Sequence, residues 1–232
     1  MAEILPFSDS APQSFIHYRL PVGILQCNCS IIGDPITREA IVVDPGDEIG
    51  RILDLVGRHK LIVKAIVSTH AHIDHVGGLA KLHQYTGAPV LMHRDDLALY
   101  QAMEMQAAFL GVPAPEIAAV DMLLKEGDSL RWGNFEAQVI HTPGHTPGSV
   151  CLYIPADAGH VTVPKPQLWA GDTLFAGSIG RTDLWGGSMD DILQSLKTKL
   201  MELPDDTVVH PGHGSNTTIG EERYSNPFLI AP

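Results

Sequence analysis

The sequence predicts an α/β fold, and three observations lead to this prediction. Apolar runs rich in valine and isoleucine alternate with amphipathic segments along the 232 residues. Glycine, proline and aspartate interrupt the runs where strands are expected to end, as in Asp44-Pro45-Gly46. Histidines and aspartates follow several of the runs directly, as expected for loops at the ends of strands. Because no linker or low-complexity tract divides the chain, we predict one domain over residues 1–232, built from two βα halves.

The first half is predicted to contain three successive strands, followed by two more strands that alternate with helices. The expected strands are residues 14–20, 24–32, 39–46, 61–69 and 88–93. A helix is predicted at 47–60 because Ile49, Ile52 and Val56 repeat at helical spacing. Two more helices are predicted, a short one at 79–87 that ends at glycine and a longer one at 95–111 capped by its leading aspartates.

The second half repeats this alternation. Strands are predicted within residues 128–141, 149–155, 166–172 and 207–214, and a helix at 189–203. The three cysteines, Cys27, Cys29 and Cys151, are an odd number without repeating spacing. We interpret them as ordinary residues of a protein from a reducing compartment.

Charge and hydropathy exclude several classes of partner. The chain has 15 Lys+Arg against 27 Asp+Glu, a formal charge of −12, with no basic block. We therefore expect no nucleic-acid partner and no anionic membrane partner. The first residues lack the cationic start and apolar run of a secretory signal, and no stretch approaches the roughly 18 apolar residues of a membrane span. A cytoplasmic protein is the resulting expectation.

The stretch THAHIDHVGG at residues 69–78 is the strongest functional signal. It holds His70, His72, Asp74 and His75 directly after a predicted buried strand. Burying four such groups without a cation would cost much free energy. His70 and His72 are two positions apart on an extended backbone, so both rings can face one point. Asp74 and His75 lie past the bend and can face a second point. The spacing predicts two metal ions.

Further ligands must come from other segments, because two pairs cannot saturate two ions. The candidates stand at strand ends beside glycine: His145 in HTPGHTPGS, Asp172 in LWAGDTLF and His213 in VVHPGHGS. His141 and His210 compete with His145 and His213 in the same segments. Spacing alone does not choose between the members of each pair.

These segments together resemble the metallo-β-lactamase-fold superfamily. The resemblance runs in the family's order from VVDPG through THAHIDHVGG, TPGHTPGS and GDTLFAGSIGRTDL to HPGHG, about 170 residues. It implies an αββα sandwich with the metals at one edge, and it selects His145 and His213. It implies that His70, His72 and His145 bind a first metal, that Asp74, His75 and His213 bind a second, that Asp172 bridges them and that Asp44 supports them.

Within that superfamily GDTLFAGSIGRTDL looks most like the glyoxalase II (hydroxyacylglutathione hydrolase) branch. Eukaryotic members of that branch hold glutathione with a lysine and a tyrosine of this loop and with a helical carboxyl-terminal domain. Here Arg181 and Asp183 stand at those two positions and the chain ends at Pro232, so the match is to the short bacterial-type relatives. We predict that Arg181 binds the substrate; the alternative is a structural ion pair with Asp183.

The ligand types also predict the chemistry. Two divalent ions, most simply zinc with iron or manganese as alternatives, would lower the pKa of a shared water and supply a bridging hydroxide. Asp74 and Asp172 are the predicted catalytic carboxylates. A thiolate leaves without an acid, which favours a small-molecule thioester, possibly glutathione-derived, as the substrate.

Three other functions are weighed against this hydrolase. A persulfide dioxygenase of the same fold uses one iron held by two histidines and an aspartate, but it has no need of the complete second set formed by Asp74, His75 and His213. A metal-binding protein without catalysis is disfavoured because every ligand position is filled. RNA processing is disfavoured by the acidic charge balance.

Overall fold

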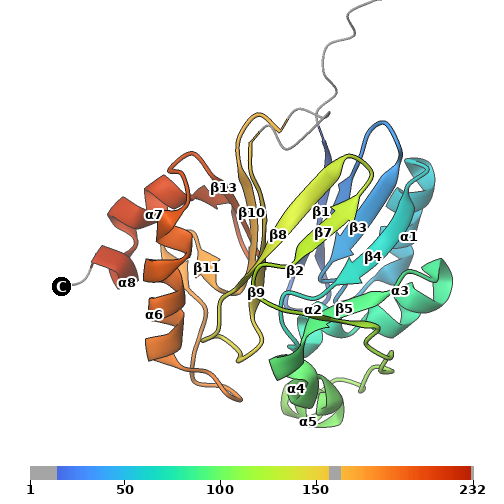
Figure 1. Ribbon diagram of the computed structural model, residues 1–232. Helices are drawn as coiled ribbons and strands as arrows, with labels where there is room; N and C mark the ends of the chain where they lie inside the picture. Colours follow the sequence, from blue (N-terminus) through green and yellow to red (C-terminus); the bar gives the residue numbers. More distant parts are fainter. Residues whose placement is uncertain (1–14, 157–162, 231–232) are drawn as a thin grey trace, which may run out of the picture.

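The structure is a computed structural model that describes residues 15–156 and 163–230. It has two six-stranded sheets that pack face to face, with helices on both outer surfaces (Figure 1). The first 13 residues, on which the expectation of no secretory signal rests, lie outside the described range. The assignment of the whole chain to one domain stays a prediction.

The first sheet has the order β1-β2-β3-β4-β5-β6. Its strands are β1 (Ile16–Val22), β2 (Cys27–Gly33), β3 (Glu39–Val43), β4 (Ile62–Val67), β5 (Val90–His93) and β6 (Met122–Leu124). The first three strands form an antiparallel meander, and β3 to β6 are parallel. The parallel strands β3 and β4 therefore end at the same edge of the sheet, which is where the THAHIDHVGG loop begins.

The second sheet has the order β14-β13-β10-β9-β8-β7. Its strands are β7 (Ser129–Trp132), β8 (Phe135–His141), β9 (Val150–Ile154), β10 (Gln167–Gly171), β13 (Val208–Pro211) and β14 (Thr217–Thr218). Only β10 and β13 are parallel neighbours within it. A separate hairpin joins β11 (Leu174–Phe175) to β12 (Ser178–Ile179).

Helices cover the outer surface of each sheet. Those beside the first sheet are α1 (Ile49–Arg58), α2 (Ile73–Val76), α3 (Leu79–Thr86), the 3₁₀ turn η1 (Arg94–Asp96), α4 (Leu97–Gln101) and α5 (Met103–Leu110). Those beside the second are α6 (Met189–Thr198), η2 (Leu200–Glu202), α7 (Ile219–Ser225) and α8 (Pro227–Ile230). No helix in the described part of the chain has the length and apolar character needed to cross a membrane.

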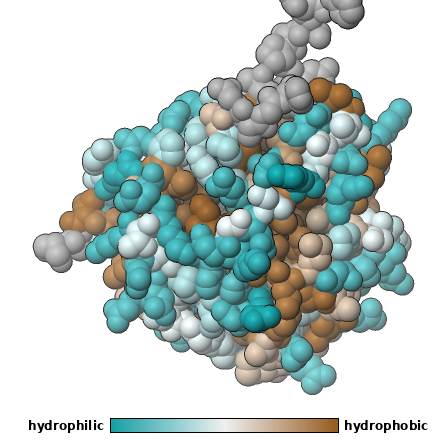
Figure 2. Space-filling model, viewed as in Figure 1, coloured by the Kyte–Doolittle hydropathy of each residue, from teal (hydrophilic) through white to brown (hydrophobic). Residues whose placement is uncertain are grey.

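Alternation along the buried strands produces three layers of core. Ile31 faces the helices of the first sheet, whereas its neighbour Ile32 faces the second sheet. Between the sheets, Ile32 and Val67 share one cluster with Trp132 and Trp169 of the second sheet. The third layer packs α6 against β10 and β13. On the outside, hydrophilic residues dominate the visible face, and apolar residues gather mainly in a strip through its middle (Figure 2).

The predicted helix at 95–111 is wrong as a single element. The chain forms η1, α4 and α5 instead, with a break at Ala102, whose backbone leaves helical geometry. The Gln106 side-chain amide and the Ala102 N–H both donate to the carbonyl oxygen of Leu99. A continuous helix would offer that oxygen to residue 103. The predicted aspartate cap is also wrong, because the His93 ring caps η1 and Asp96 faces inward.

His17 of β1 and His210 of β13 pack against each other between the two sheets, the first half-buried and the second buried. Their ring centroids lie 4.5 Å apart, and His210 Nε2 lies 2.8 Å from Gln167 Oε1. Burial, with a smaller contribution from Arg19, lowers the pKa of His17 to about 4. Burial, with His17, lowers the pKa of His210 to about 3. Both imidazoles are therefore neutral in the folded protein at neutral pH.

This pair is expected to make folding stability fall with acid. Each folded-state pKa lies below the ordinary value of about 6.5, so the unfolded chain binds more protons below that pH. The stability that depends on these two imidazoles being neutral is fully present above about pH 6.5 and is lost as the pH falls toward 4. Urea unfolding at pH 7, 5.5 and 4.5, with metal held in excess, should show a smaller pH dependence in His210→Gln than in the parent protein. An identical dependence in both proteins would contradict this account.

Candidate metal centre

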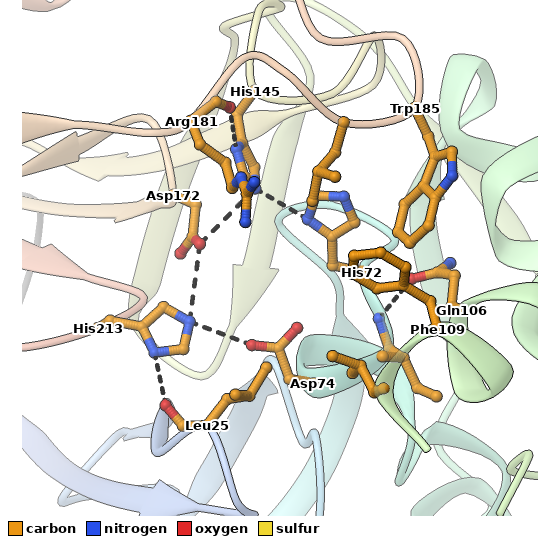
Figure 3. A pocket seen from close by; sticks show the side chains of 13 residues that line it. Leu25, His72, Asp74, Gln106, Phe109, His145, Asp172, Arg181, Trp185 and His213 are labelled. Carbon is orange, nitrogen blue, oxygen red and sulfur yellow. Dashed lines mark hydrogen bonds and ion pairs between the residues drawn. The ribbon is translucent and has the colours of Figure 1, made fainter. Parts of the chain in front are cut away.

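The seven predicted ligands come together at one edge of the sandwich, from both sheets. The loop after β4 and helix α2 carry four of them, and the ends of β8, β10 and β13 lead to one each. They are His70, His72, Asp74, His75, His145, Asp172 and His213. Figure 3 shows His72 and Asp74 on the side of the first sheet, facing His145, Asp172 and His213 from the second. The structure therefore brings all seven residues together at the strand ends.

One group consists of three buried imidazoles, His70, His72 and His145, each with a ring nitrogen within 4.8 Å of the others. His72 Nδ1 lies 2.9 Å from His145 Nε2. The ring of His70 stands nearly perpendicular to both neighbours, with centroid distances of 4.9 and 4.7 Å. These are the three residues that the resemblance assigned to a first metal.

A second group consists of Asp74, His75 and His213. His213 Nε2 lies 3.2 Å from both His75 Nε2 and Asp74 Oδ2. Asp172 stands between the two groups, since Oδ1 is 3.4 Å from His75 Nε2 and Oδ2 is 3.6 Å from His145 Nε2. One carboxylate therefore reaches both groups, as a bridging ligand must.

Hydrogen bonds to the backbone orient two of the histidines. His145 Nδ1 lies 2.8 Å from the carbonyl oxygen of Arg181, and His213 Nδ1 lies 3.1 Å from that of Leu25. A carbonyl oxygen only accepts, so each Nδ1 carries the proton and each Nε2 keeps its lone pair for the cluster. Leu25 belongs to the β1–β2 turn. A turn of the first sheet therefore orients His213, which belongs to the second sheet.

Asp44 orients His70 and His75 in a similar way. Its carboxylate accepts hydrogen bonds from the Thr69 N–H at 2.7 Å and from the Thr69 hydroxyl at 2.6 Å, and it lies 3.0 Å from His75 Nδ1. The Thr69 oxygen in turn lies 3.1 Å from His70 Nδ1. Asp44 thus supports the cluster without joining it, as the resemblance implied.

Protonation states suit a metal at His70, His72 and Asp74. Burial lowers the pKa of His70 well below its ordinary value, and the charge of His75 adds to this effect. Burial lowers the pKa of His72 to about 3. Burial alone would raise the pKa of Asp74, but His75 and His213 outweigh it and the net shift is downward. At neutral pH His70 and His72 are therefore neutral and Asp74 is ionised, which are the forms that bind divalent cations. At His75 and His213, burial alone would lower the pKa, but nearby anionic groups outweigh it and raise the pKa of both imidazoles, so a cation must displace their protons.

The donor set passes two tests of fit to metal ions. His70 Nε2 and Asp172 Oδ1 are buried and have no hydrogen-bond partner among the described residues. Buried polar atoms are rarely left in this state unless something else contacts them. Nitrogens at about 2.0–2.1 Å from a tetrahedral ion would lie about 3.3 Å apart. The separations of 2.9 to 3.6 Å found between neighbouring donors bracket that value.

Comparison with known proteins gives the family. The family model described as the metallo-beta-lactamase superfamily matches residues 22–213. The chain belongs to the metallo-beta-lactamase superfamily. The αββα sandwich predicted for it is confirmed, and the superfamily's fold binds divalent metal ions.

Three relatives show the range of this superfamily around the chain. Hydroxyacylglutathione hydrolase GloC of Haemophilus influenzae is 37% identical over 212 residues, covering 90% of this chain and 96% of that protein. The crystal structure of BLEG-1 B3 metallo-beta-lactamase is similar with a TM-score of 0.84 and 36% identity, covering 93% of this chain and all of that one. The crystal structure of TTHA1623 in a di-iron-bound form is similar with a TM-score of 0.80 and 40% identity, covering 91% and 100%.

The two competing histidines lie elsewhere in this superfamily fold. His141 is the last residue of β8; its ring stacks on His93 with centroids 4.0 Å apart, and Nε2 lies 2.9 Å from the carbonyl oxygen of Pro147. His210 lies within β13, so strand alternation directs its ring toward His17 and Trp169. Only His145 and His213, which follow the strands, reach the cluster.

Several glycines near the ligands have no room for a side chain, and two of them show the effect clearly. A Cβ at Gly212 would overlap the Asp172 carboxylate, and a Cβ at Gly46 would overlap the carbonyl oxygen of Asp74. The close approach of backbone that was expected beside His213 is present at Gly212, and Gly46 provides a second close approach that was not predicted.

Two supporting residues were missed by sequence reasoning. Asp96 is fully buried, and its carboxylate accepts hydrogen bonds from the Ala71 N–H at 2.8 Å, the Thr146 hydroxyl at 2.8 Å and the Gly148 N–H at 2.6 Å. Ala71 lies between His70 and His72 in the chain and Thr146 follows His145, so Asp96 joins the two loops that carry the first group. A lone aspartate in a predicted helix gives no sequence signal of this role.

Gln106 of α5 is the second missed residue. Its side-chain oxygen accepts from the Ile73 N–H at 2.9 Å, and its side-chain nitrogen donates to the carbonyl oxygens of Ala71 and Leu99 at 3.0 Å. One buried amide thus fixes the backbone on both sides of His72. The hydrogen bond from Gln106 to Leu99 accompanies the helix break at Ala102.

Arg181 lines the cavity in front of the cluster, as the substrate-binding prediction requires. Its guanidinium also makes the alternative ion pair, because Nε and Nη2 donate to the two carboxylate oxygens of Asp183 at 2.7 and 2.9 Å. Both side chains are exposed. The pair with Asp183 holds the guanidinium beside the cavity. The ion pair leaves other N–H groups of Arg181 that could bind a substrate.

The cavity has a volume of about 310 Å³ and lies over the metal-binding groups. Its wall opposite Asp172 and His213 is apolar, with Trp185 and Phe109 on the far side of His72 (Figure 3). Leu25 closes the edge beside His213. A small molecule can therefore contact the cluster and an apolar wall at once.

Proposed function

We propose that this protein is a binuclear metal-dependent hydrolase of thioesters, similar to hydroxyacylglutathione hydrolase. In this proposal, His70, His72 and His145 hold one divalent ion, and Asp74, His75 and His213 hold the other. Asp172 is the shared ligand. The observation that carries the proposal is the completeness of both groups, joined by one carboxylate that lies within 3.6 Å of members of each.

Bound divalent ions would supply Lewis-acid polarisation of a carbonyl and a water of lowered pKa. The protein's own groups fix the orientation of the donors, through Asp44, Thr69 and the carbonyl oxygens of Leu25 and Arg181. A thiol with a pKa near 8.5 is expelled as a thiolate without a proton donor, whereas an amine must be protonated. This difference favours a thioester over an amide as the substrate.

The GloC relative supports the hydroxyacyl thioester chemistry, since it covers nearly the whole of both chains. Arg181, with its free N–H groups at the cavity mouth, is the proposed contact for a substrate carbonyl or carboxylate. The metal is proposed to be zinc or iron, the latter because TTHA1623 was solved in a di-iron-bound form.

The test combines metal analysis with a substrate panel. Protein purified from its native host should contain two divalent ions per chain, and it should release free thiol from S-lactoylglutathione in a metal-dependent reaction. A β-lactam and glutathione persulfide serve as comparison substrates. One ion per chain under metal excess, with oxygen consumed on glutathione persulfide and no thioester cleaved, would replace the proposal with the dioxygenase alternative.

A further inference from the structure

The cavity wall raises a question about what the substrate carries besides its thioester. Six large apolar side chains line the cavity, and besides Ile73 and Leu110 they are Leu25, Phe109, Leu184 and Trp185. Phe109 is 62% exposed and Leu25 is 44% exposed, although both lie beside the most polar part of the fold. Large apolar side chains left accessible around a cavity indicate contact with an apolar ligand.

The aromatic members of this wall are held in a fixed arrangement. Phe109, near the end of α5, meets Trp185 edge to face, with ring centroids 5.4 Å apart. Trp185 also contacts the edge of the His72 ring, at a centroid distance of 5.9 Å. Because His72 belongs to the first group, the aromatic wall begins where the reacting carbonyl would be held. A ligand group adjacent to that carbonyl would lie on these rings.

Apart from the proposed metal ions, the side chains of the lining provide little positive charge for an anionic group of the substrate. Among the described residues that line the cavity, Arg181 is the one lysine or arginine, and Asp183 already neutralises it. The adjoining hollow of about 470 Å³ shares Leu25, Ile73, Asp74 and Leu110 with the cavity. It adds Lys81 but also Asp47. A glutathione thioester brings two carboxylates and one ammonium group. Beyond the proposed metal ions, the described lining offers no pair of unpaired cations for the two carboxylates.

We infer that the wall formed by Leu25, Phe109, Leu184 and Trp185 is a specificity subsite for an uncharged aromatic or branched apolar group of the substrate. The inference rests on the proposed function and narrows it, because the preferred thioester would be a neutral apolar one and glutathione derivatives would be poorer substrates. The apolar group can belong to the acyl side or to the thiol side. The experiment separates these two sources.

Four thioesters test the inference, combining a lactoyl or a phenylacetyl group with glutathione or N-acetylcysteamine. The phenylacetyl thioester of N-acetylcysteamine should have a kcat/KM at least about tenfold above that of S-lactoylglutathione. The reason is that burial of an aromatic ring contributes more binding free energy than a single hydrogen bond does. A gain that follows the acyl group assigns the subsite to the acyl side. If kcat/KM instead rises with the neutral thiol, or with a benzyl thiol in its place, the subsite binds the thiol side of the substrate. S-lactoylglutathione as the best of the panel would overturn the inference.

Variants connect the preference to the wall. Phe109→Ala and Trp185→Ala should each raise KM for the preferred thioester about tenfold and change KM for S-lactoylglutathione less than about twofold, with kcat and metal content retained. Trp185→Phe should restore most of the preference. Met105→Ala is the matched control, since Met105 is exposed on the same helix α5 but does not line the cavity. Equal losses for both substrates in the Phe109 and Trp185 variants would contradict the subsite.

A binding measurement without catalysis distinguishes a failure of the proposed thioester hydrolysis from a failure of the apolar subsite. The thioether S-benzyl-N-acetylcysteamine cannot be hydrolysed, and calorimetry should show it binding the metal-loaded protein more tightly than S-carboxymethylglutathione, with the difference lost in Trp185→Ala. Tight thioether binding with no thioester cleaved would refute the proposed reaction and keep the apolar subsite. Thioester cleavage with no preference in either assay would keep the reaction and refute the subsite.

Discussion

Replacing His145 with alanine is expected to remove close to one metal ion per chain and to lower kcat for thioester cleavage by more than about 100-fold. His145 Nε2 lies 2.9 Å from His72 Nδ1 and 3.6 Å from Asp172 Oδ2, so its loss opens the first group on the side of the bridging carboxylate. Elemental analysis after gel filtration and a thiol-release assay measure the two effects.

His141→Ala is the matched control for that experiment, because His141 precedes the same loop. Its ring stacks on His93, and Nε2 lies near the carbonyl oxygen of Pro147, away from the cluster. This variant should keep both ions and lose less than about tenfold in kcat, with a stability loss of about 1 kcal/mol from the missing hydrogen bond and packing. Equal metal loss in the His141 and His145 variants would show that the ligand assignment is wrong.

Asp96 should give the largest effect of any residue outside the cluster. Removing its carboxylate leaves the Ala71 and Gly148 N–H groups and the Thr146 hydroxyl without their acceptor, inside the protein. Asp96→Ala is expected to cost about 2–4 kcal/mol of unfolding free energy. Because those groups flank His72 and His145, metal affinity should also fall by about 10- to 100-fold.

Asp96→Asn separates positioning from folding. The amide keeps the size and one acceptor oxygen, so the protein should fold while at least one of the three hydrogen bonds is lost. Competition with a chromogenic chelator should show weaker metal binding, while the urea midpoint falls less than in Asp96→Ala. Asp95→Ala provides the comparison, since Asp95 is the exposed neighbour in the same turn. Metal affinity as high in Asp96→Asn as in Asp95→Ala would mean that Asp96 only stabilises the fold.

Local pattern explains why much of this architecture was predictable. Strands such as β3 and β4 are short apolar runs stopped by polar or turn residues, and helix α1 has a regular apolar stripe, so their positions follow from neighbouring residues alone. The ligand loops were predictable for a related reason. Parallel strands end at a common edge, and the histidines and aspartates stand where the strands end.

Interactions between distant segments explain what the sequence did not show. The break at Ala102 depends on Gln106 reaching backbone on both sides of His72, and the inward turn of Asp96 depends on donors near residue 146. Spacing left His141 against His145 open because both follow an apolar run. His141 contacts His93 of the other sheet and therefore points away from the cluster. A contact between distant segments leaves no local sequence pattern, so it could not be predicted.

The origin of the ligands in both sheets also bears on the order of folding. His70 and His213 lie far apart in the chain, so the cluster is a set of long-range contacts that forms slowly compared with local structure. Trp132 and Trp169 lie in the core between the sheets, so their fluorescence reports when the sheets have joined. In stopped-flow refolding, uptake of metal should follow that fluorescence change and never precede it. A newly made chain would then lack a metal-binding centre until its second sheet has been synthesised, and the apolar inner face of the first sheet would stay uncovered for the same interval.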